Sequence, residues 1–321
     1  KMAKSRRLVN IGFIMIKKEY TYKSASGICD IKAWQFAPDG EVKAVIQMHH
    51  GMAEHTNRYR NFISAFTDRG YAIFINDMLG HGQSNEDKEL LGYFGDKDGY
   101  KNILADAKAL TDIAKKEYPD KKFIIAGHSM GSLIMRCYIN EYGNDFDGAV
   151  FIGTAGPTHI AKAGIPIMKV VAALKGKKHH SKFLNNISLG PYDKPFEHRT
   201  HYDWGMRDTK EVDEYVADPL CGFLFTVAGF MDLSQLTIQC NEDRWFNNVA
   251  KDKPVLLMSG DMDPVGNYGK GVTEVYRKLL ETDHKNVTLK LYHEARHEIL
   301  NELNKDEVYN DLEHWIEENI L

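Results

Sequence analysis

Cysteine is scarce in this sequence, and the four cysteines that occur follow no recognisable pattern. Cys29, Cys137, Cys221 and Cys240 lie far apart among 321 residues, and no CxxC pair is present. Disulfide frameworks and zinc sites need cysteines at short or regular spacings. The pattern therefore predicts reduced thiols in a cytoplasmic protein, and it implies no metal site and no organic cofactor.

A convincing targeting segment is also missing. Residues 1–7 are basic and residues 8–16 are largely apolar, an arrangement that faintly resembles a secretion signal. This apolar run is too short to cross a bilayer, and Lys17 and Lys18 end it without a small-residue cleavage site. A start at Met15 would make residues 1–14 an upstream extension, and we expect a cytoplasmic protein.

Excess positive charge is absent as well. The chain has 41 basic and 45 acidic residues, which gives a net charge of −4 and no reason to expect nucleic acid as a partner. Hydrophobic residues make up 43% and charged residues 27%, the mixture of a globular protein with a sizeable core. The length suffices for one α/β domain of ordinary size with an inserted piece.

Short apolar runs alternate with longer amphipathic stretches, and no internal repeat occurs. The chain opens with a predicted antiparallel pair at 18–22 and 28–36. Buried strands are predicted at 44–48, 72–76, 123–126, 149–152, 255–258 and 287–292. Helices are predicted at 59–69, 99–117, 130–141, 272–280 and 305–318. This alternation predicts an α/β fold with a mostly parallel central sheet and helices on both faces.

Residues 156–236 break this alternation, because they contain no convincing buried strand. The pattern at 166–174 predicts a short helix with Pro166 in its first turn, and 223–231 is apolar and aromatic. We expect a helical cap at 156–236, inserted into a core of 1–155 and 237–321. An ordinary extra helical layer is the alternative. The basic loop at 175–180 is expected to be solvated, with transient contact to an anionic lipid surface as the less favoured interpretation.

The strongest chemical signal is Gly127-His128-Ser129-Met130-Gly131, a G-x-S-x-G motif between a predicted strand and a predicted helix. A serine on so sharp a turn strains the backbone, and small flanking residues relieve the crowding. The amide of Met130 would lie at a helix N-terminus, where an oxyanion is stabilised. The motif predicts Ser129 as a nucleophile, and a chance match in a glycine-containing loop is the alternative.

A serine hydroxyl is a weak nucleophile at neutral pH and needs a base. Two downstream loops offer an acid and then a histidine, the order in which partners follow a serine of this kind. One loop contains Asp261 and Asp263, and the other contains His293 and His297. Because Asp261 and His293 abut their strands, we prefer Asp263 and His297, which lie deeper in their loops.

The second oxyanion donor is expected in the loop after the strand at 44–48. Gly51 lets the backbone bend toward the nucleophile, which leaves the amide of Met52 placed to donate. His49 and His50 invite interpretation as metal ligands. Adjacent residues of an extended chain point in opposite directions, however, so a structural role is preferred.

In this order, the segments HHGMAEHTNRY, DMLGHGQS, GHSMGS, SGDMDPVG and ARHEILNE resemble the monoacylglycerol lipase and lysophospholipase branch of the α/β-hydrolases. The segment YVADPLCGFLFT at 215–226 is similar to bacterial members labelled lysophospholipase. The resemblance runs from about residue 20 to the C-terminus. It implies the α/β-hydrolase fold, a triad of Ser129, Asp263 and His297, and an oxyanion hole formed by the amides of Met52 and Met130.

The resemblance also bears on substrate binding. Glu54 and Arg58 match positions near the polar end of the family's pocket, where a buried ion pair bracing the loop is preferred over substrate contact. Met52 is bulkier than the small residue of animal relatives, which changes the expected pocket shape. The apolar cap residues expected to face the substrate are Ile167, Val171, Phe223 and Phe225.

Together these features predict a serine carboxylic ester hydrolase that acts through an acyl-enzyme. The expected substrate is a single-chain lipid ester, such as a monoacylglycerol or a lysophospholipid, or another medium-chain ester. The same triad could instead cleave an amide, a thioester or a carbon–carbon bond. A binding protein without turnover is a further alternative, against which the intact set of three residues argues.

Overall fold

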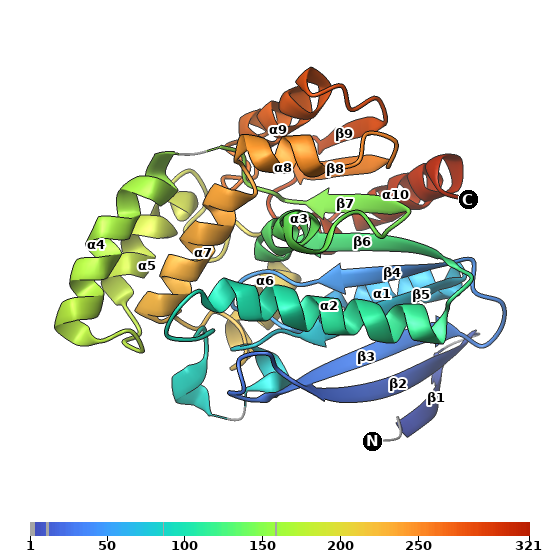
Figure 1. The fold of residues 1–321 in the computed structure, drawn as a ribbon, viewed down its shortest axis with the longest axis horizontal. Helices are drawn as coiled ribbons and strands as arrows, with labels where there is room; N and C mark the ends of the chain where they lie inside the picture. Colours follow the sequence, from blue (N-terminus) through green and yellow to red (C-terminus); the bar gives the residue numbers. More distant parts are fainter. Residues whose placement is uncertain (1–3, 11–12, 86, 158) are drawn as a thin grey trace.

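The computed structural model describes residues 4–10, 13–85, 87–157 and 159–321. These residues form one nine-stranded sheet in the spatial order β1-β2-β3-β5-β4-β6-β7-β8-β9 (Figure 1). The strands are β1 (Lys4–Asn10), β2 (Phe13–Lys23), β3 (Asp30–Pro38), β4 (Ala44–His49), β5 (Tyr71–Asp77), β6 (Lys122–His128), β7 (Gly148–Ile152), β8 (Val255–Gly260) and β9 (Val287–Tyr292). Strands β4 to β9 are mutually parallel, whereas β1, β2 and β3 pair antiparallel with their neighbours.

Helices cover both faces of the sheet. They are α1 (Arg60–Asp68), α2 (Gly99–Glu117), α3 (Met130–Tyr142), α4 (His159–Lys175), α5 (Lys182–Ser188), α6 (Thr209–Ala217), α7 (Val227–Gln239), α8 (Asp243–Asn248), α9 (Lys270–Glu281) and α10 (Lys305–Asn319). In Figure 1, α2 and α3 lie in front of the sheet, α1 and α10 lie behind it, and α4, α5 and α7 lie beyond one end of the parallel strands. Within the described residues, every helix is too short or too polar to span a bilayer.

Alternate residues of the central strands pack against the two helical layers. On β4, Val45 belongs to the cluster that includes α2 and α3, whereas Ile46 belongs to the cluster with α1 and α10. All residues of β4 and β5 are buried, as expected for parallel strands covered on both faces. The hydrophobic runs of the sequence therefore become the middle layer of a three-layer structure.

The predicted parallel strands and core helices are confirmed to within two residues of their bounds. Strand β1 was not predicted, because its apolar residues were assigned to a separate N-terminal run. The predicted short helix at 166–174 is wrong in its start: α4 begins at His159, so Pro166 lies inside the helix rather than in its first turn. Proline removes one backbone hydrogen bond there, and packing of α4 against α7 compensates for the loss.

Residues 156–236, called the inserted segment below, contain α4, α5, α6 and most of α7. The expected boundary at residue 236 falls inside α7, whose Phe230 and Leu236 belong to the same hydrophobic cluster as α2 and α3. Helix α7 thus packs on the core as well as on α4. It forms the layer between the sheet and the outer helices.

Arg136 on α3 binds the chain just before and just after the inserted segment. Its buried guanidinium donates to Thr154 Oγ1 at 3.1 Å and Ala155 O at 2.9 Å on the outgoing chain. It also donates to Cys240 O at 2.6 Å and Asn241 Oδ1 at 2.9 Å on the returning chain. Burial lowers the pKa of this guanidinium below its ordinary value, and the oxygens it binds are neutral.

Replacing Arg136 by methionine should lower the free energy of unfolding by about 3 kcal/mol, because the oxygens it binds would stay buried without donors. Arg277→Met is the matched control, since that side chain is 67% exposed, and its effect should stay within about 0.5 kcal/mol. Urea unfolding followed by circular dichroism measures both. Equal effects of the two substitutions would contradict the structural role of Arg136.

Candidate active site

Ser129 occupies the turn between β6 and α3 in a strained backbone conformation. Its φ of 54° and ψ of −122° are unusual for a residue with a side chain, and such strain costs about 1–3 kcal/mol. The Ser129 amide donates to Ile152 O at 2.9 Å, and its carbonyl accepts from the Ser132 amide at 2.9 Å. These bonds to β7 and α3 hold the turn that the G-x-S-x-G motif predicts.

Asp263 and His297 form a buried hydrogen-bonded pair. His297 Nδ1 lies 3.0 Å from Asp263 Oδ1, and the two residues are 3% and 0% exposed. Burial raises the pKa of Asp263, but the charge and hydrogen bond of His297 outweigh it, and the pKa is lowered. Asp263 also accepts from the Val265 amide and from Ser259 Oγ. An ionised carboxylate at Nδ1 leaves Nε2 of His297 as the basic nitrogen.

The alternative acid and histidine form a different pair at the surface. Asp261 Oδ2 lies 3.0 Å from Nδ1 of His293, which is 87% exposed. Asp261 also accepts from the Glu294 amide of the neighbouring loop. The structure therefore separates a buried pair, Asp263 with His297, from an exposed one.

His297 and Ser129 approach one another at the carboxyl ends of β6 and β7. The ring centroids of His297 and His128 are 4.7 Å apart, and His128 directly precedes Ser129. A Cβ added to Gly153, the residue after the Ser129 acceptor, would lie 3.1 Å from His297 Cε1. These two described residues, Ser129 and His297, do not share a hydrogen bond here, and such bonds are often long until substrate binds.

The two predicted oxyanion donors lie on segments that touch Ser129. Met130 is the first residue of α3, so its amide is among those that a helix leaves unpaired. Neither the Met52 amide nor the Met130 amide has an acceptor among the described residues. A Cβ added to Gly51 would lie 3.2 Å from Ser129 Cβ, so the loop carrying Met52 packs directly against the serine.

Glu54 connects this loop to the residue before Ser129. Its Oε1 accepts from the Gly51 amide and from Tyr59 Oη at 2.9 Å, and it lies 3.4 Å from His128 Nδ1. His128 Nε2 lies 3.2 Å from the carbonyl oxygen of His297 and donates to it. Although burial opposes both charges, their mutual interaction lowers the pKa of Glu54 to about 2 and raises the pKa of His128. The site thus holds Glu54 against His128 beside the serine turn, an arrangement that favours the ionised carboxylate and the protonated imidazole.

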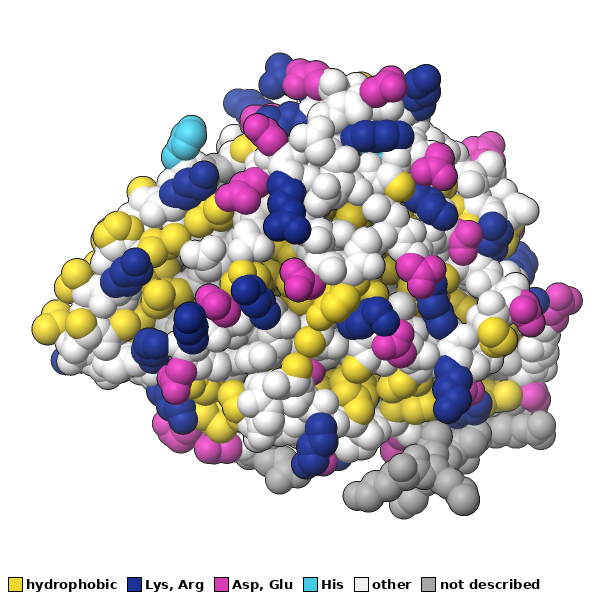
Figure 2. Space-filling view, in the orientation of Figure 1, with side chains coloured by type: hydrophobic (Ala, Val, Ile, Leu, Met, Phe, Trp, Pro, Cys, Tyr) yellow, Lys and Arg dark blue, Asp and Glu magenta, His cyan; other side chains and the backbone are white. Residues whose placement is uncertain are grey.

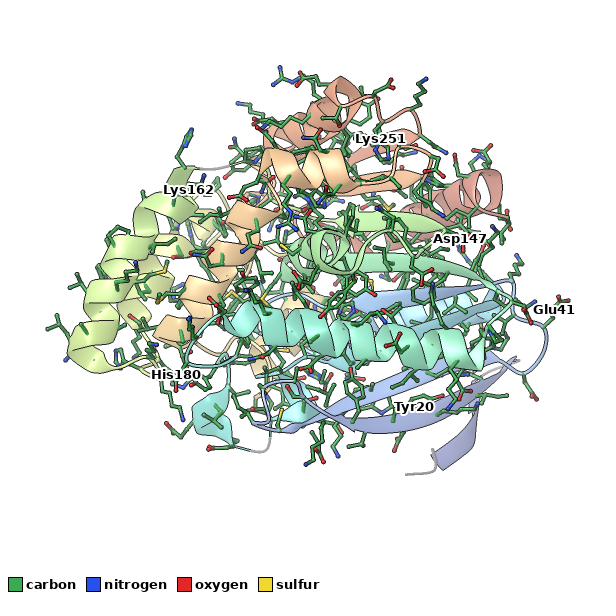
Figure 3. All side chains as sticks on the ribbon, viewed as in Figure 1. Tyr20, Glu41, Asp147, Lys162, His180 and Lys251 are labelled. Carbon is green, nitrogen blue, oxygen red and sulfur yellow. The ribbon has the colours of Figure 1, made fainter. Side chains whose placement is uncertain are left out.

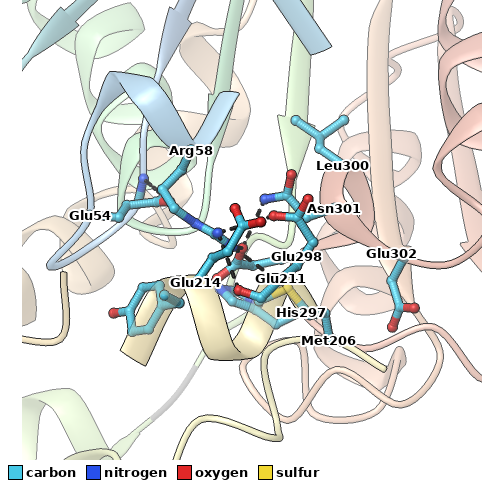
Figure 4. A network of polar contacts seen from close by, with 12 residues as sticks. Glu54, Arg58, Met206, Glu211, Glu214, His297, Glu298, Leu300, Asn301 and Glu302 are labelled. Atoms are coloured by element: carbon cyan, nitrogen blue, oxygen red, sulfur yellow. Dashed lines mark hydrogen bonds and ion pairs between the residues drawn. The ribbon is translucent and has the colours of Figure 1, made fainter. Parts of the chain in front are cut away.

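Arg58 was expected to pair with Glu54, and that expectation is wrong. Arg58 Nη2 lies 2.7 Å from Glu298 Oε2, and Nη1 lies 3.2 Å from Glu211 Oε2 (Figure 4). Glu54 is already satisfied by Gly51, Tyr59 and His128, so Arg58 turns to the glutamates of two other elements. It connects α6 of the inserted segment to the residue that follows His297.

Further contacts bind the inserted segment to residues 293–304, which join β9 to α10, carry His297 and are called the histidine loop below. The Trp204 ring lies 5.3 Å from the His297 ring, and Gly205 O accepts from the Glu298 amide at 2.7 Å. Arg207 pairs with Glu302 at 3.0 Å on the same loop. Trp204 was not singled out as a site residue, because an aromatic residue in an irregular insertion has no periodicity that indicates what it faces. Its place beside the imidazole makes it part of the site.

The four apolar residues expected to face the substrate lie in different environments. Phe225 is fully buried against the rings of His81, Phe94 and Phe230. Phe223 is half-buried beside His81, and Val171 is half-buried against the core. Ile167 is 44% exposed. Their places range from the core interior for Phe225 to the exposed side of α4 for Ile167.

One group of described side chains has the composition of a metal site. His55, Asp218 and Cys221 bring their ligand atoms within 4.8 Å of one another. Asp218 Oδ2 lies 2.9 Å from His55 Nε2, however, and Asp218 Oδ1 accepts from the Leu220 amide. Burial raises the pKa of the Cys221 thiol well above its ordinary value, which opposes the thiolate that a metal requires. Hydrogen bonding within the protein accounts for this group.

The chain is similar to proteins of known family. The family model Hydrolase_4, described as serine aminopeptidase, S33, matches residues 40–304. A monoacylglycerol lipase of Mycolicibacterium smegmatis is 26% identical over 301 residues, which are 94% of this chain and 97% of the relative. The human monoglyceride lipase is 29% identical over 283 residues, which are 87% and 84% of the two chains.

Solved structures agree with this similarity. The crystal structure of a thermostable carboxyl esterase from Bacillus coagulans, in complex with glycerol, has a TM-score of 0.89 at 29% identity. The alignment covers 95% of this chain and 99% of that chain. The predicted α/β-hydrolase fold is thereby confirmed.

Replacing Glu54 by glutamine should destabilise the protein in a pH-dependent way. The pair with His128 contributes its full stability above the ordinary pKa of glutamate, 4.5, and loses it as pH rises through the raised pKa of His128, above 6.5. We expect a loss of about 3 kcal/mol at pH 6 and a smaller loss at pH 9, measured by urea unfolding. Glu214→Gln is the control, since Glu214 is 41% exposed. A loss of equal size at both pH values would contradict the charged pair.

Proposed function

This chain belongs to the Hydrolase_4 family, described as serine aminopeptidase, S33, and is a hydrolase of the serine esterase type; from that premise we propose that it cleaves single-chain lipid esters through an acyl-enzyme. The observation that carries the proposal is the buried Asp263–His297 pair at the edge of the sheet where Ser129 sits on a strained turn. A nucleophile, a base and an orienting acid are the parts that acyl transfer from an ester requires.

In the proposed mechanism, Ser129 Oγ attacks the ester carbonyl while Nε2 of His297 accepts the hydroxyl proton. Asp263 keeps the imidazole in the tautomer that leaves Nε2 free, and it stabilises the imidazolium that forms. His297 then returns the proton to the leaving alcohol. Water deprotonated by the same imidazole hydrolyses the acyl-enzyme and regenerates Ser129.

The amides of Met52 and Met130 are the proposed oxyanion hole. Their lack of acceptors among the described residues leaves both N–H groups available to a developing oxyanion. Glu54 supports this arrangement, because it binds the Gly51 amide on one side and His128 on the other. Backbone donors held in this way need no reorganisation when the tetrahedral intermediate forms.

The inserted segment, residues 156–236, is the proposed cap, with the core formed by 1–155 and 237–321. Trp204 and Gly205 of this segment contact the histidine loop directly, and Arg58 of the core joins the segment's Glu211 to Glu298. These contacts support a role over the site. The relatives named monoacylglycerol or monoglyceride lipase, and the esterase crystallised with glycerol, support a monoacylglycerol-type or lysophospholipid-type ester as substrate. Phe223 and Val171 are the proposed inner apolar contacts of the acyl chain.

A fluorophosphonate should label Ser129, and Asp263→Asn should slow both labelling and ester turnover by roughly a hundredfold or more, because the wrong imidazole tautomer cannot act as base. Asp261→Asn is the matched control on the same loop and should leave both rates nearly unchanged. Peptide mass spectrometry locates the adduct. Labelling of Ser132, or equal losses from the two aspartate variants, would contradict the assignment.

Turnover should rise with acyl chain length until the pocket is full. Each buried methylene contributes about 0.8 kcal/mol, which is roughly a three- to fourfold gain in kcat/KM per carbon. We expect Val171→Ala to weaken the preference for long chains and Val170→Ala, at a residue 59% exposed, to leave it unchanged.

The measurement is kcat/KM for p-nitrophenyl esters from acetate to myristate, with monoacylglycerol, lysophospholipid and an aminoacyl anilide beside them. The aminoacyl anilide tests the amide cleavage that the name of the family model suggests. A profile that peaks at acetate would overturn the lipid substrate while leaving the esterase mechanism intact.

A further inference from the structure

Two buried histidines lie beside the loop that carries Met52. His50 directly follows β4, and His81 lies in the loop after β5, the strand that pairs with β4 in the sheet. Both side chains are 0% exposed, so neither contributes to the molecular surface drawn in Figure 2. Their rings lie 5.1 Å apart in an edge-to-face arrangement. Neither histidine takes part in the proton transfers of the proposed mechanism.

Hydrogen bonds to main-chain groups determine the tautomer of His50. Its Nε2 lies 3.1 Å from the Met78 amide, which can only donate, so this nitrogen accepts and the ring proton is on Nδ1. Nδ1 lies 2.8 Å from Gly51 O and therefore donates to it. Burial lowers the pKa of His50 below its ordinary value, which favours the neutral ring that these two bonds require.

His81 has the same tautomer and binds the other end of the Met52 loop. Its Nε2 accepts from the Ala53 amide at 3.2 Å, and its Nδ1 donates to Leu79 O at 3.1 Å. Burial lowers the pKa of His81 to about 3, so this ring is neutral as well. Ala53 has a φ of 52°, a left-handed conformation that is costly for a residue with a side chain. His81 thus stabilises a backbone conformation that the local sequence does not favour.

The remaining main-chain groups of this loop leave one donor free. The Gly51 amide donates to Glu54 Oε1. The Ala53 carbonyl oxygen accepts from the Gly222 amide of the inserted segment at 2.9 Å. Among the amides of Gly51, Met52 and Ala53, the Met52 amide is therefore the one without an acceptor in the described part of the chain.

The bond from His50 also sets the direction of the Met52 amide. The Gly51 carbonyl and the Met52 N–H belong to one planar trans peptide group, so they point in opposite directions. Because His50 is bound at the carbonyl end, the N–H points away from His50. Rotation of this peptide would break the bond to His50 and exchange the N–H for a carbonyl oxygen, which would repel an oxyanion.

We propose that His50 and His81 are positioning residues for the oxyanion hole: His50 sets the direction of the Met52 N–H, and His81 holds Ala53 in its left-handed conformation. The inference rests on the proposed function, because an oxyanion hole has a role only if Ser129 attacks a carbonyl. Both histidines act through main-chain groups, and neither exchanges a proton.

A simple structural link between the two loops would make a different demand on the rings. The bonds that cross from one loop to the other both use Nε2, from His50 to the Met78 amide and from His81 to the Ala53 amide. Positioning of the Met52 N–H instead needs Nδ1 of His50, which binds within its own loop. The two roles therefore differ in which nitrogen of His50 matters.

The test replaces each histidine by asparagine, whose amide lies near the place of Nδ1, and by glutamine, whose amide lies near the place of Nε2. His50→Gln and His81→Asn remove the positioning bonds, so kcat for p-nitrophenyl octanoate should fall roughly a hundredfold with KM nearly unchanged. His50→Asn and His81→Gln keep these bonds and should lose no more than about fivefold. Affinity for a trifluoromethyl ketone, whose adduct with a serine carries an oxyanion, should fall in parallel with kcat.

His284 is the matched control, because it is a buried histidine at the opposite end of the sheet. It is 1% exposed, and its Nε2 donates to Lys253 O at 3.0 Å, just before β8. Figure 3 labels Glu41, Asp147 and Lys251, which precede β4, β7 and β8 and so mark the amino ends of these strands. His284→Asn should lower the melting temperature, because it removes this bond, and leave kcat unchanged.

Circular dichroism melting checks that the variants are folded, and NMR of the imidazole nitrogens tests the tautomers in the unsubstituted protein. Both His50 and His81 should be neutral at pH 8 with the proton on Nδ1. A proton on Nε2 of either ring, or equal kcat for His50→Gln and His50→Asn, would overturn the positioning roles while wild-type turnover stands. Wild-type protein that neither cleaves the ester nor reacts with a fluorophosphonate would overturn the proposed function, and this inference with it.

Discussion

The direct backbone contact between the Ser129 turn and the loop after β4 is the constraint on which the site depends. A Cβ on Gly131 would lie 2.2 Å from His49 O, and one on Gly51 would lie 3.2 Å from Ser129 Cβ. Because no side chain separates the two segments, the Ser129 hydroxyl and the amides of Met52 and Met130 share one small region. Packing of the sheet and α3 holds Ser129 at a φ of 54°, which its local sequence would not favour.

Three buried ionisable groups hold the loop that carries His297 from different directions. Asp263 binds the His297 side chain, His128 binds the His297 carbonyl oxygen, and Arg58 binds Glu298, the next residue. His128 is itself held by Glu54, and Arg58 by Glu211. Each charge has a partner within the protein, which is the condition under which burial of ionised groups is tolerated. The position of the imidazole therefore depends on the inserted segment as well as on the core.

The inserted segment has two surfaces of different character. Its inner side places Trp204 beside His297 and packs α4 against α7, whereas the exposed side of α4 and α5 carries apolar residues and lysines. Helix α7 contacts both α4 and the core helices α2 and α3, so it joins these outer helices to the core.

Hydrophobic periodicity and turn chemistry determined the core of this protein from sequence alone. The parallel strands, the core helices and the positions of Ser129, Asp263 and His297 at strand ends follow from local patterns, because each element has its own period and each loop its own spacing. The choice of Asp263 over Asp261 was also available, since depth in a loop limits which side chain can reach a neighbouring strand.

Tertiary structure alone decided which buried charges meet and which way the inserted helices face. The sequence placed Glu54 and Arg58 close together and suggested an ion pair, but their partners come from residues up to 240 positions away. The start of α4, the exposure of Ile167 and the burial of Phe225 likewise depend on contacts with α7 and with the loop near His81. Local sequence sets the period of an element, whereas the side that is buried depends on which distant surface the fold brings against it.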